Sequence, residues 1–249
     1  MQRFFYGVGA CLLMVLAVSC ASTESQDRRR TVEEIFAEAM EAYNDGDWID
    51  ALAKFDIIKL QYPTSQFAAD AQYYVAEVNY RRGEFILAAF NYSVVRRSFP
   101  TSPRAKESAF KIGTCYEELA LPADRDQDYT QKAIAAYTEF QSIYPRDSLA
   151  LVSLERIRSL RDRLAERYMV IAEHYQKTES RKSALIYYNL VLAEYPDSHY
   201  YEEAIVRKIR VLYDLARYDE ARSAIALYRT TVPDPTMAAE VDELERSLP

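Results

Sequence analysis

Apolar side chains recur every three or four residues along most of this chain, which is the spacing of one face of an α-helix. Residues 48–61 illustrate the pattern, because Trp48, Leu52, Phe55 and Ile58 form a single apolar stripe. Prolines follow several such stripes, and a proline ends a helix and pushes the residue before it toward an extended conformation. The pattern therefore predicts an all-α protein in which prolines mark helix ends.

Five of these prolines belong to an internal repeat. They stand at positions 63, 100, 145, 196 and 233, which are 37, 45, 51 and 37 residues apart, and each follows an aromatic or apolar residue. Twelve residues before each proline is an alanine, and eight before it is a large apolar or aromatic residue. The alanines are Ala51, Ala88, Ala133, Ala184 and Ala221; the large residues are Phe55, Tyr92, Tyr137, Tyr188 and Ile225. A period in the mid-thirties indicates a solenoid.

Each position of the repeat has a physical role. Alanine lets a second helix approach closely. Gly46 and Gly83, seventeen residues before two of the prolines, are predicted to lie in the turn between the two helices of a unit. Serines shortly after four of the prolines are predicted to cap the next helix. These are Ser65, Ser102, Ser148 and Ser198. Each unit is therefore expected to be helix–turn–helix.

A small residue, an aromatic four later and a proline twelve later resemble the tetratricopeptide repeat. Ala39, Ala76 and Ala172 occupy the matching small position of the first helices, whereas Ile209 does not. We expect a tetratricopeptide-repeat solenoid of five units closed by a capping helix from Pro235 to Ser247, because a terminal repeat must cover its apolar face. The units are approximately residues 31–63, 66–100, 103–145, 148–196 and 199–233.

The fourth unit departs from the others. Ser148 to Lys177 contains no proline or glycine, which predicts one helix about 45 Å long. Its buried stripe is predicted to be Ile157, Leu160, Leu164, Tyr168, Ile171 and Tyr175. This helix divides the solenoid into residues 31–145 and 146–249. The third unit carries an insertion, Leu121–Asp128, in which Ala123 is expected to face solvent.

The N-terminus is a separate segment. The apolar run Phe4–Val18 is shorter than the ~20 residues that a spanning helix needs, so residues 1–19 are interpreted as a secretory signal. The sequence Leu16-Ala17-Val18-Ser19-Cys20 resembles a bacterial lipobox, which implies a lipid on Cys20 and a polar tether over residues 20–30. Ordinary cleavage after a small residue, with Cys20 incidental, is the alternative.

Charge and motifs exclude several function classes. The chain has 31 basic and 38 acidic residues and a net charge of −7, without a basic stripe, which argues against nucleic-acid binding. Removal of the signal removes Cys11, and acylation would block Cys20, so Cys115 would be the one free thiol left. No internal disulfide is therefore expected. There are two histidines and no Cys-x-x-Cys, His-Glu-x-x-His or Gly-x-Ser-x-Gly motif. We expect no enzymatic activity, no metal and no cofactor.

A binding surface is the remaining expectation. In tetratricopeptide units the first helices line the concave face, and counting along the first three units places aromatics and a methionine there, edged by carboxylates. The predicted peptide-binding residues are Phe36, Met40, Tyr43, Tyr73, Glu77, Tyr80, Arg81 and Phe110. This chemistry suits an extended apolar peptide better than an acidic tail. For each aromatic the alternative is packing between repeats.

Residues 158–198 resemble the segment that joins repeats in BamD-type outer-membrane assembly lipoproteins. The shared features are Asp162-Arg163-Leu164-Ala165, Tyr168 and Ala172-Glu173-His174-Tyr175. The resemblance runs from Cys20 to about residue 233. It implies a lipid-anchored scaffold on the periplasmic face of the outer membrane of a Gram-negative-type bacterium, acting in β-barrel assembly.

The same resemblance implies the partners. Repeats one to three would receive the C-terminal segments of unfolded barrel proteins, and repeats four and five would dock on periplasmic domains of the membrane-embedded barrel component, with other assembly lipoproteins as further partners. The alternative is a Tol-linked periplasmic repeat protein that coordinates wall synthesis with outer-membrane constriction. That type normally has a coiled-coil trimerisation segment before its repeats, for which residues 21–30 are too short.

Overall fold

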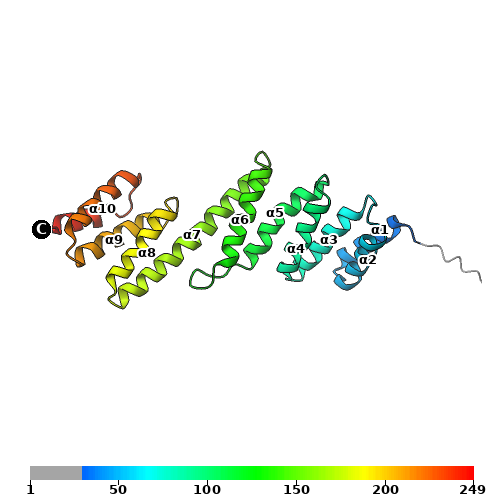
Figure 1. Ribbon diagram of the computed structural model, residues 1–249, viewed down its shortest axis with the longest axis horizontal. Coiled ribbons are helices and arrows are strands. Elements are labelled where there is room, and N and C mark those ends of the chain that lie inside the picture. The colour runs from blue at the N-terminus through cyan, green and yellow to red at the C-terminus, as the bar shows by residue number, and fades with distance from the viewer. Residues whose placement is uncertain (1–29) are drawn as a thin grey trace, which may run out of the picture.

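The computed structural model describes residues 30–249, which form eleven α-helices and no strand. Helices α1 to α10 zigzag in one elongated row, and each packs mainly on its neighbours in sequence (Figure 1). Helix α11 packs mainly on α9. Their bounds are α1 Val32–Asp45, α2 Trp48–Gln61, α3 Ala68–Arg81, α4 Phe85–Ser98, α5 Pro103–Glu118, α6 Asp128–Ile143, α7 Ser148–Lys177, α8 Arg181–Glu194, α9 Tyr201–Asp214, α10 Tyr218–Thr231 and α11 Ala238–Ser247. The all-α prediction is confirmed.

The repeat positions lie where the helices cross. All five second-helix alanines are fully buried, and so are the large residues four positions after them, with Ile225 the most exposed at 2%. The residue before each repeat proline is the C-cap of its helix: Tyr62, Phe99, Tyr144, Tyr195 and Val232. The repeat prolines therefore mark the helix ends, and the repeat alanines with the large residues four positions later mark the faces on which the helices pack.

The turn between the two helices of a unit has one recurring backbone conformation. Gly46 and Gly83 adopt left-handed φ values of 79° and 75°. Glu179 and Ala216 stand at the same repeat position in units four and five, and they also have positive φ values, 59° and 55°. The turn geometry is thus kept where glycine is absent.

The predicted serine caps are correct only at Ser102, whose hydroxyl accepts a hydrogen bond from the Arg104 backbone N–H at 3.2 Å. The prediction was wrong for Ser148, because Asp147 caps α7 instead. It was also wrong for Ser65 and Ser198, after which the chain makes one more turn before the helix begins.

The third unit replaces the small alanine of the first helix by Gly113. A Cβ built at Gly113 would lie 2.6 Å from two ring carbons of Tyr137, so no larger residue fits while this ring stays in place. The side chain of Tyr137, on α6, is therefore seated directly against the α5 backbone.

The insertion is folded against α7 rather than exposed. Ala123 was predicted to face solvent, but only 5% of it is exposed. The Gln127 side-chain amide donates to the backbone carbonyl of Pro122 at 2.7 Å, and Arg167 on α7 donates to the carbonyl of Ala123 at 3.3 Å. These contacts hold the loop down over the neighbouring helix.

Helix α7 is continuous over 30 residues, as predicted. Ile157 and Leu160 pack with residues of α6, and the buried residues from Leu164 to Ala172 belong to one cluster with α8. Leu160 and Leu164 of the predicted stripe are buried, and the stripe's other members are partly buried. Because the helix is covered on two sides, Ala165, Met169 and Ala172 are buried as well.

The apolar core is a series of clusters that follow one another along the solenoid. The largest extends from Leu164 on α7 to Val241 on α11. Helix α11 begins three residues after Pro235, and Val241 is fully buried against this cluster. The predicted cap therefore closes the C-terminal end.

Candidate functional site

The eight predicted binding residues lie on the first helices of units one to three: α1 holds Phe36, Met40 and Tyr43; α3 holds Tyr73, Glu77, Tyr80 and Arg81; α5 holds Phe110. They differ in accessibility. Tyr73 and Glu77 are buried, with 4% and 6% of the residue exposed. Arg81 is exposed, and the other five are partly buried.

An aromatic cluster joins the first two units. Phe36 stacks on Phe67 with ring centroids 4.7 Å apart, and Tyr43 lies 5.7 Å from Trp48 in an edge-to-face arrangement. Both also contact the ring of Tyr74 on α3, at 6.3 and 5.1 Å. Tyr74 was missed by the sequence reasoning, because it stands one position beyond the one counted as groove-lining. Its pairing with Tyr73 in sequence was the available signal.

Hydrogen bonds then tie α3 to α5. The Tyr73 hydroxyl donates to Glu107 at 2.6 Å, and the Tyr80 hydroxyl donates to Glu118 at 3.0 Å. Arg104 forms an ion pair with Asp70 at 2.6 Å, and its guanidinium carbon lies 4.5 Å from the Tyr73 ring centroid. The predicted tyrosines thus serve partly as inter-repeat contacts.

Glu77 is a compensated buried carboxylate. It accepts a hydrogen bond from the Tyr92 hydroxyl and pairs with the Lys111 ammonium at 3.0 Å. Burial, then the nearby Glu77 charge, raises the pKa of Tyr92, so this phenol stays protonated and continues to donate. Glu77 therefore stabilises the packing of α3, α4 and α5, and its carboxylate is already engaged.

The surface that remains open is aromatic and apolar: the partly exposed Phe36, Met40, Tyr43, Tyr80 and Phe110 with Arg81 beside them. Burial, followed by the hydrogen bond to Glu118, raises the pKa of Tyr80 to about 12, so its phenol is neutral at physiological pH. Such a surface can bind an apolar chain through its side chains. It holds no paired nucleophile and base.

The described part of the chain offers little for metal binding, thiol chemistry or membrane crossing. Residues 30–249 contain no cluster of three or more His, Cys, Asp or Glu that could hold a metal ion. Burial raises the pKa of the Cys115 thiol to about 12, which disfavours the reactive thiolate. No helix between residues 30 and 249 has the length and apolar character to cross a bilayer. The predicted signal and lipidation site, Cys20, lie outside the described residues.

Comparison with known proteins agrees with the resemblance seen in the sequence. The chain is 22% identical over 231 residues to the outer membrane protein assembly factor BamD of Caulobacter vibrioides, which covers 89% of this chain and 76% of that protein. It is 24% identical over 207 residues to BamD of Neisseria gonorrhoeae, and that match covers 78% of this chain and 78% of that protein. Among solved structures, a TPR repeats protein from Bacteroides fragilis superposes with a TM-score of 0.48 at 13% identity. That match covers 87% of this chain and 98% of the other.

The family model YfiO, described as outer membrane lipoprotein, matches residues 28–227, which include four complete helix–turn–helix units and most of the fifth. This chain belongs to that family.

Proposed function

We propose that this protein is a lipid-anchored periplasmic scaffold of the outer-membrane machinery that assembles β-barrel proteins. The observation that carries the proposal is the family match over residues 28–227, together with relatives named outer membrane protein assembly factors. The match favours this role over the Tol-linked alternative. Cys20 would carry the lipid, and residues 20–30 would tether the solenoid to the inner leaflet of the outer membrane.

The N-terminal units would receive unfolded barrel proteins. A terminal barrel strand alternates apolar and polar residues, so its apolar side chains point to one side and can be buried together. The open surface of Phe36, Met40, Tyr43 and Tyr80 offers complementary apolar contacts. Tyr73 and Glu77 would act indirectly, by holding α3 against α4 and α5.

The C-terminal units would dock on the periplasmic domains of the membrane-embedded barrel component. This assignment rests on the family resemblance. The continuous core from Leu164 to Val241 makes α7 to α11 one packed body that could present such a docking surface. Helix α7 also packs on α6 of the N-terminal half.

The test uses the full-length protein and a synthetic peptide with the C-terminal strand sequence of a barrel protein. Fully burying one apolar side chain is worth ~1.5–3 kcal/mol, and ordering the peptide offsets part of it. The double variant Tyr43→Ala with Tyr80→Ala should therefore weaken peptide binding about tenfold or more. Tyr213→Ala is the matched control, because all three tyrosines stand eight residues before the repeat alanine of their unit.

Both variants should keep the helical circular-dichroism signal, and the double variant should still co-purify with the barrel component. Unchanged peptide affinity in the folded double variant would place substrate binding elsewhere. Loss of the barrel component with normal peptide binding would reverse the assignment of the two halves. Mass spectrometry of the native N-terminus tests the anchor separately, and an unmodified cysteine there would refute lipidation.

A further inference from the structure

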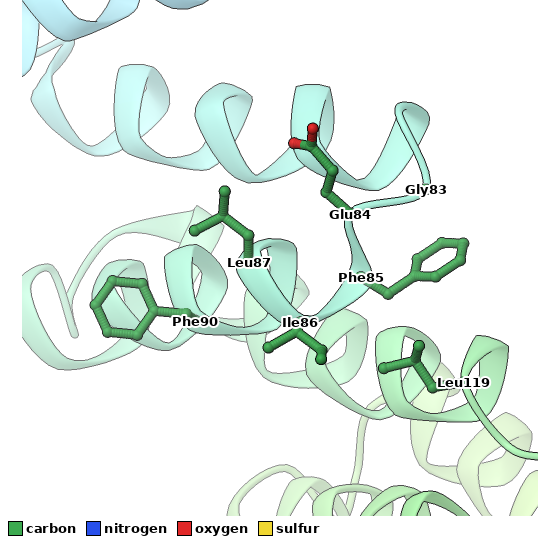
Figure 2. Close-up of a pocket in the computed structure, with 7 residues that line it drawn as sticks. All are labelled: Gly83, Glu84, Phe85, Ile86, Leu87, Phe90 and Leu119. Atoms are coloured by element: carbon green, nitrogen blue, oxygen red, sulfur yellow. The ribbon is translucent and has the colours of Figure 1, made fainter.

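Helix α4 carries an exposed apolar strip on the side away from its core. Ile86, Leu87 and Phe90 are 60%, 48% and 57% exposed, although each is large and apolar. Figure 2 shows Ile86 and Phe85 beside Leu119 of the α5 C-cap, with Phe90 further along α4. Together with the Gly83 turn they line a cleft of about 540 Å³.

The cleft continues into a groove between α4 and α6. Ile86 and Phe90 belong to both parts, and the second part has a volume of about 510 Å³. Small residues, Ala89 on α4 with Ala135 and Ala136 on α6, line its walls. Small side chains let a further helix approach closely, as they do at the crossings inside this solenoid.

In the described part of the chain, the groove has an unpaired cation toward each end, although the whole chain has a net charge of −7. Lys132 lies near the start of α6, whereas Arg97 lies in the last turn of α4, beside Ile143 and Tyr144 at the end of α6. Arg96 pairs with Glu139 across the groove. Within residues 30–249, no carboxylate lies within ion-pair distance of Arg97 or Lys132. The groove thus combines apolar walls with two cations that lack an acidic partner.

The groove suits a helical occupant. Its walls are helices whose backbone groups bond internally, and the hydroxyl of Ser93 in the groove already donates to the Phe90 carbonyl at 2.7 Å. A helix needs no backbone partners from such walls, because it satisfies its own N–H and C=O groups. Helix α4 has 14 residues, so the groove offers a length of about 20 Å, or roughly four helical turns.

We propose that the α4–α6 groove binds an amphipathic α-helix of a partner protein, with its apolar face on Ile86 and Phe90 and acidic residues near Arg97 and Lys132. This is the helix-in-groove mode of recognition. The groove runs between the second helices α4 and α6, and Ile112 and Tyr116 of α5 also line it. None of the eight residues predicted to bind barrel segments lines it, so it is separate from that surface. A partner could therefore occupy it while that surface holds substrate.

The probe is a synthetic helical peptide of about fifteen residues, with leucines along one face and a glutamate in each terminal turn. A second peptide has lysines in place of the glutamates. Wild-type protein should bind the glutamate peptide, and Ile86→Glu should weaken binding about tenfold or more. Ile49→Glu should change it less than about twofold. Ile49 is 78% exposed and, like Ile86, stands two residues before its repeat alanine, so it is a matched control.

The double variant Arg97→Ala with Lys132→Ala should lower the affinity for the glutamate peptide several-fold and reduce the salt dependence of binding. In the wild-type protein, hydrogen exchange should show that the bound peptide protects the backbone amides of α4 and α6. Four results would each overturn the proposal: no binding of the glutamate peptide, equal binding of the lysine peptide, equal loss with Ile49→Glu, or protection confined to other helices. Vesicles of phosphatidylglycerol and sedimentation of the protein alone test the other occupants. If the wild-type protein does not bind the peptide but binds vesicles, and Ile86→Glu abolishes vesicle binding, the groove would be assigned to lipid. If it instead self-associates and Ile86→Glu abolishes this, the groove would be assigned to a second copy of the chain.

Discussion

The Tyr73 hydroxyl on α3 donates to the Glu107 carboxylate on α5 over 2.6 Å, and the two residues are 34 positions apart in the chain. The same interval separates three ion pairs: Asp70 with Arg104, Glu77 with Lys111, and Glu173 with Arg207. In each case a first helix is joined to the first helix of the next unit. Successive units are therefore held in register by polar contacts one repeat apart, in addition to apolar burial.

The Tyr73–Glu107 bond can be tested alone. Tyr73→Phe removes the hydroxyl and keeps the ring, so it should lower the free energy of unfolding by about 0.5–1.5 kcal/mol in urea titrations. Glu107 would keep its ion pair with Arg104. Tyr116→Phe is the control, because the Tyr116 hydroxyl forms no hydrogen bond within residues 30–249, and it should change stability far less. Equal losses would show that the bond contributes nothing specific.

The left-handed turn predicts stabilising substitutions. The positive φ values of Glu179 and Ala216 destabilise the folded state by about 1–2 kcal/mol relative to glycine, because their Cβ atoms crowd the backbone. Glycine is also more flexible in the unfolded chain, which offsets part of this difference. Glu179→Gly and Ala216→Gly should each raise the free energy of unfolding by roughly 0.5–1 kcal/mol. Glu179→Ala, which removes the charge but keeps the Cβ, should not reproduce the gain.

The converse substitution is Gly83→Ala. Nothing lies within 4 Å of a Cβ built there, so any loss of stability reports the backbone conformation alone. We expect a loss of about 1 kcal/mol. An unchanged melting temperature would show that the turn readily adopts another conformation.

Overpacking tests the helix crossings and the insertion. Ala88→Leu and Ala184→Leu should each cost roughly 1–3 kcal/mol, because both alanines are fully buried where two helices meet. Ala123→Leu should also destabilise, because Ala123 is buried where the insertion folds against α7. Ala37→Leu, on the exposed side of α1, is the control and should be nearly neutral. Neutral behaviour of Ala123→Leu would mean that the loop lifts away from α7 at little cost.

Stability should fall at alkaline pH. Burial, with carboxylate hydrogen bonds at two of the three, raises the pKa of Tyr80, Tyr195 and Tyr228 to about 12. In the unfolded chain tyrosine ionises near pH 10, so the contribution of these phenols is complete below about pH 10 and is lost as pH rises toward 12. Urea titrations at increasing pH should show this decline, and Tyr80→Phe should make it shallower. A constant stability up to pH 12 would contradict it.

Local sequence alone determined the units of this protein. The alanine, the large residue four later and the proline lie within one helix and its end, so their effects on helix packing and termination operate over a few residues. This is why Ala88, Tyr92 and Phe99 stand where predicted, and why α7 is continuous. Of the candidate site, the sequence placed the eight residues on first helices but did not separate the open Tyr43 from the buried Tyr73.

Contacts between distant segments decided the rest. Ala123 is buried because arginines of α7, more than 40 residues later, bind the carbonyls of its loop. Tyr74 became the centre of the aromatic cluster because its ring meets side chains from α1 and α2. Ile86 and Phe90 have the composition of core residues, yet they are exposed, because α4 is covered on only one side and the groove toward α6 is left open. Helical periodicity shows which residues share a face; only the packing of the neighbouring helices determines whether that face is covered.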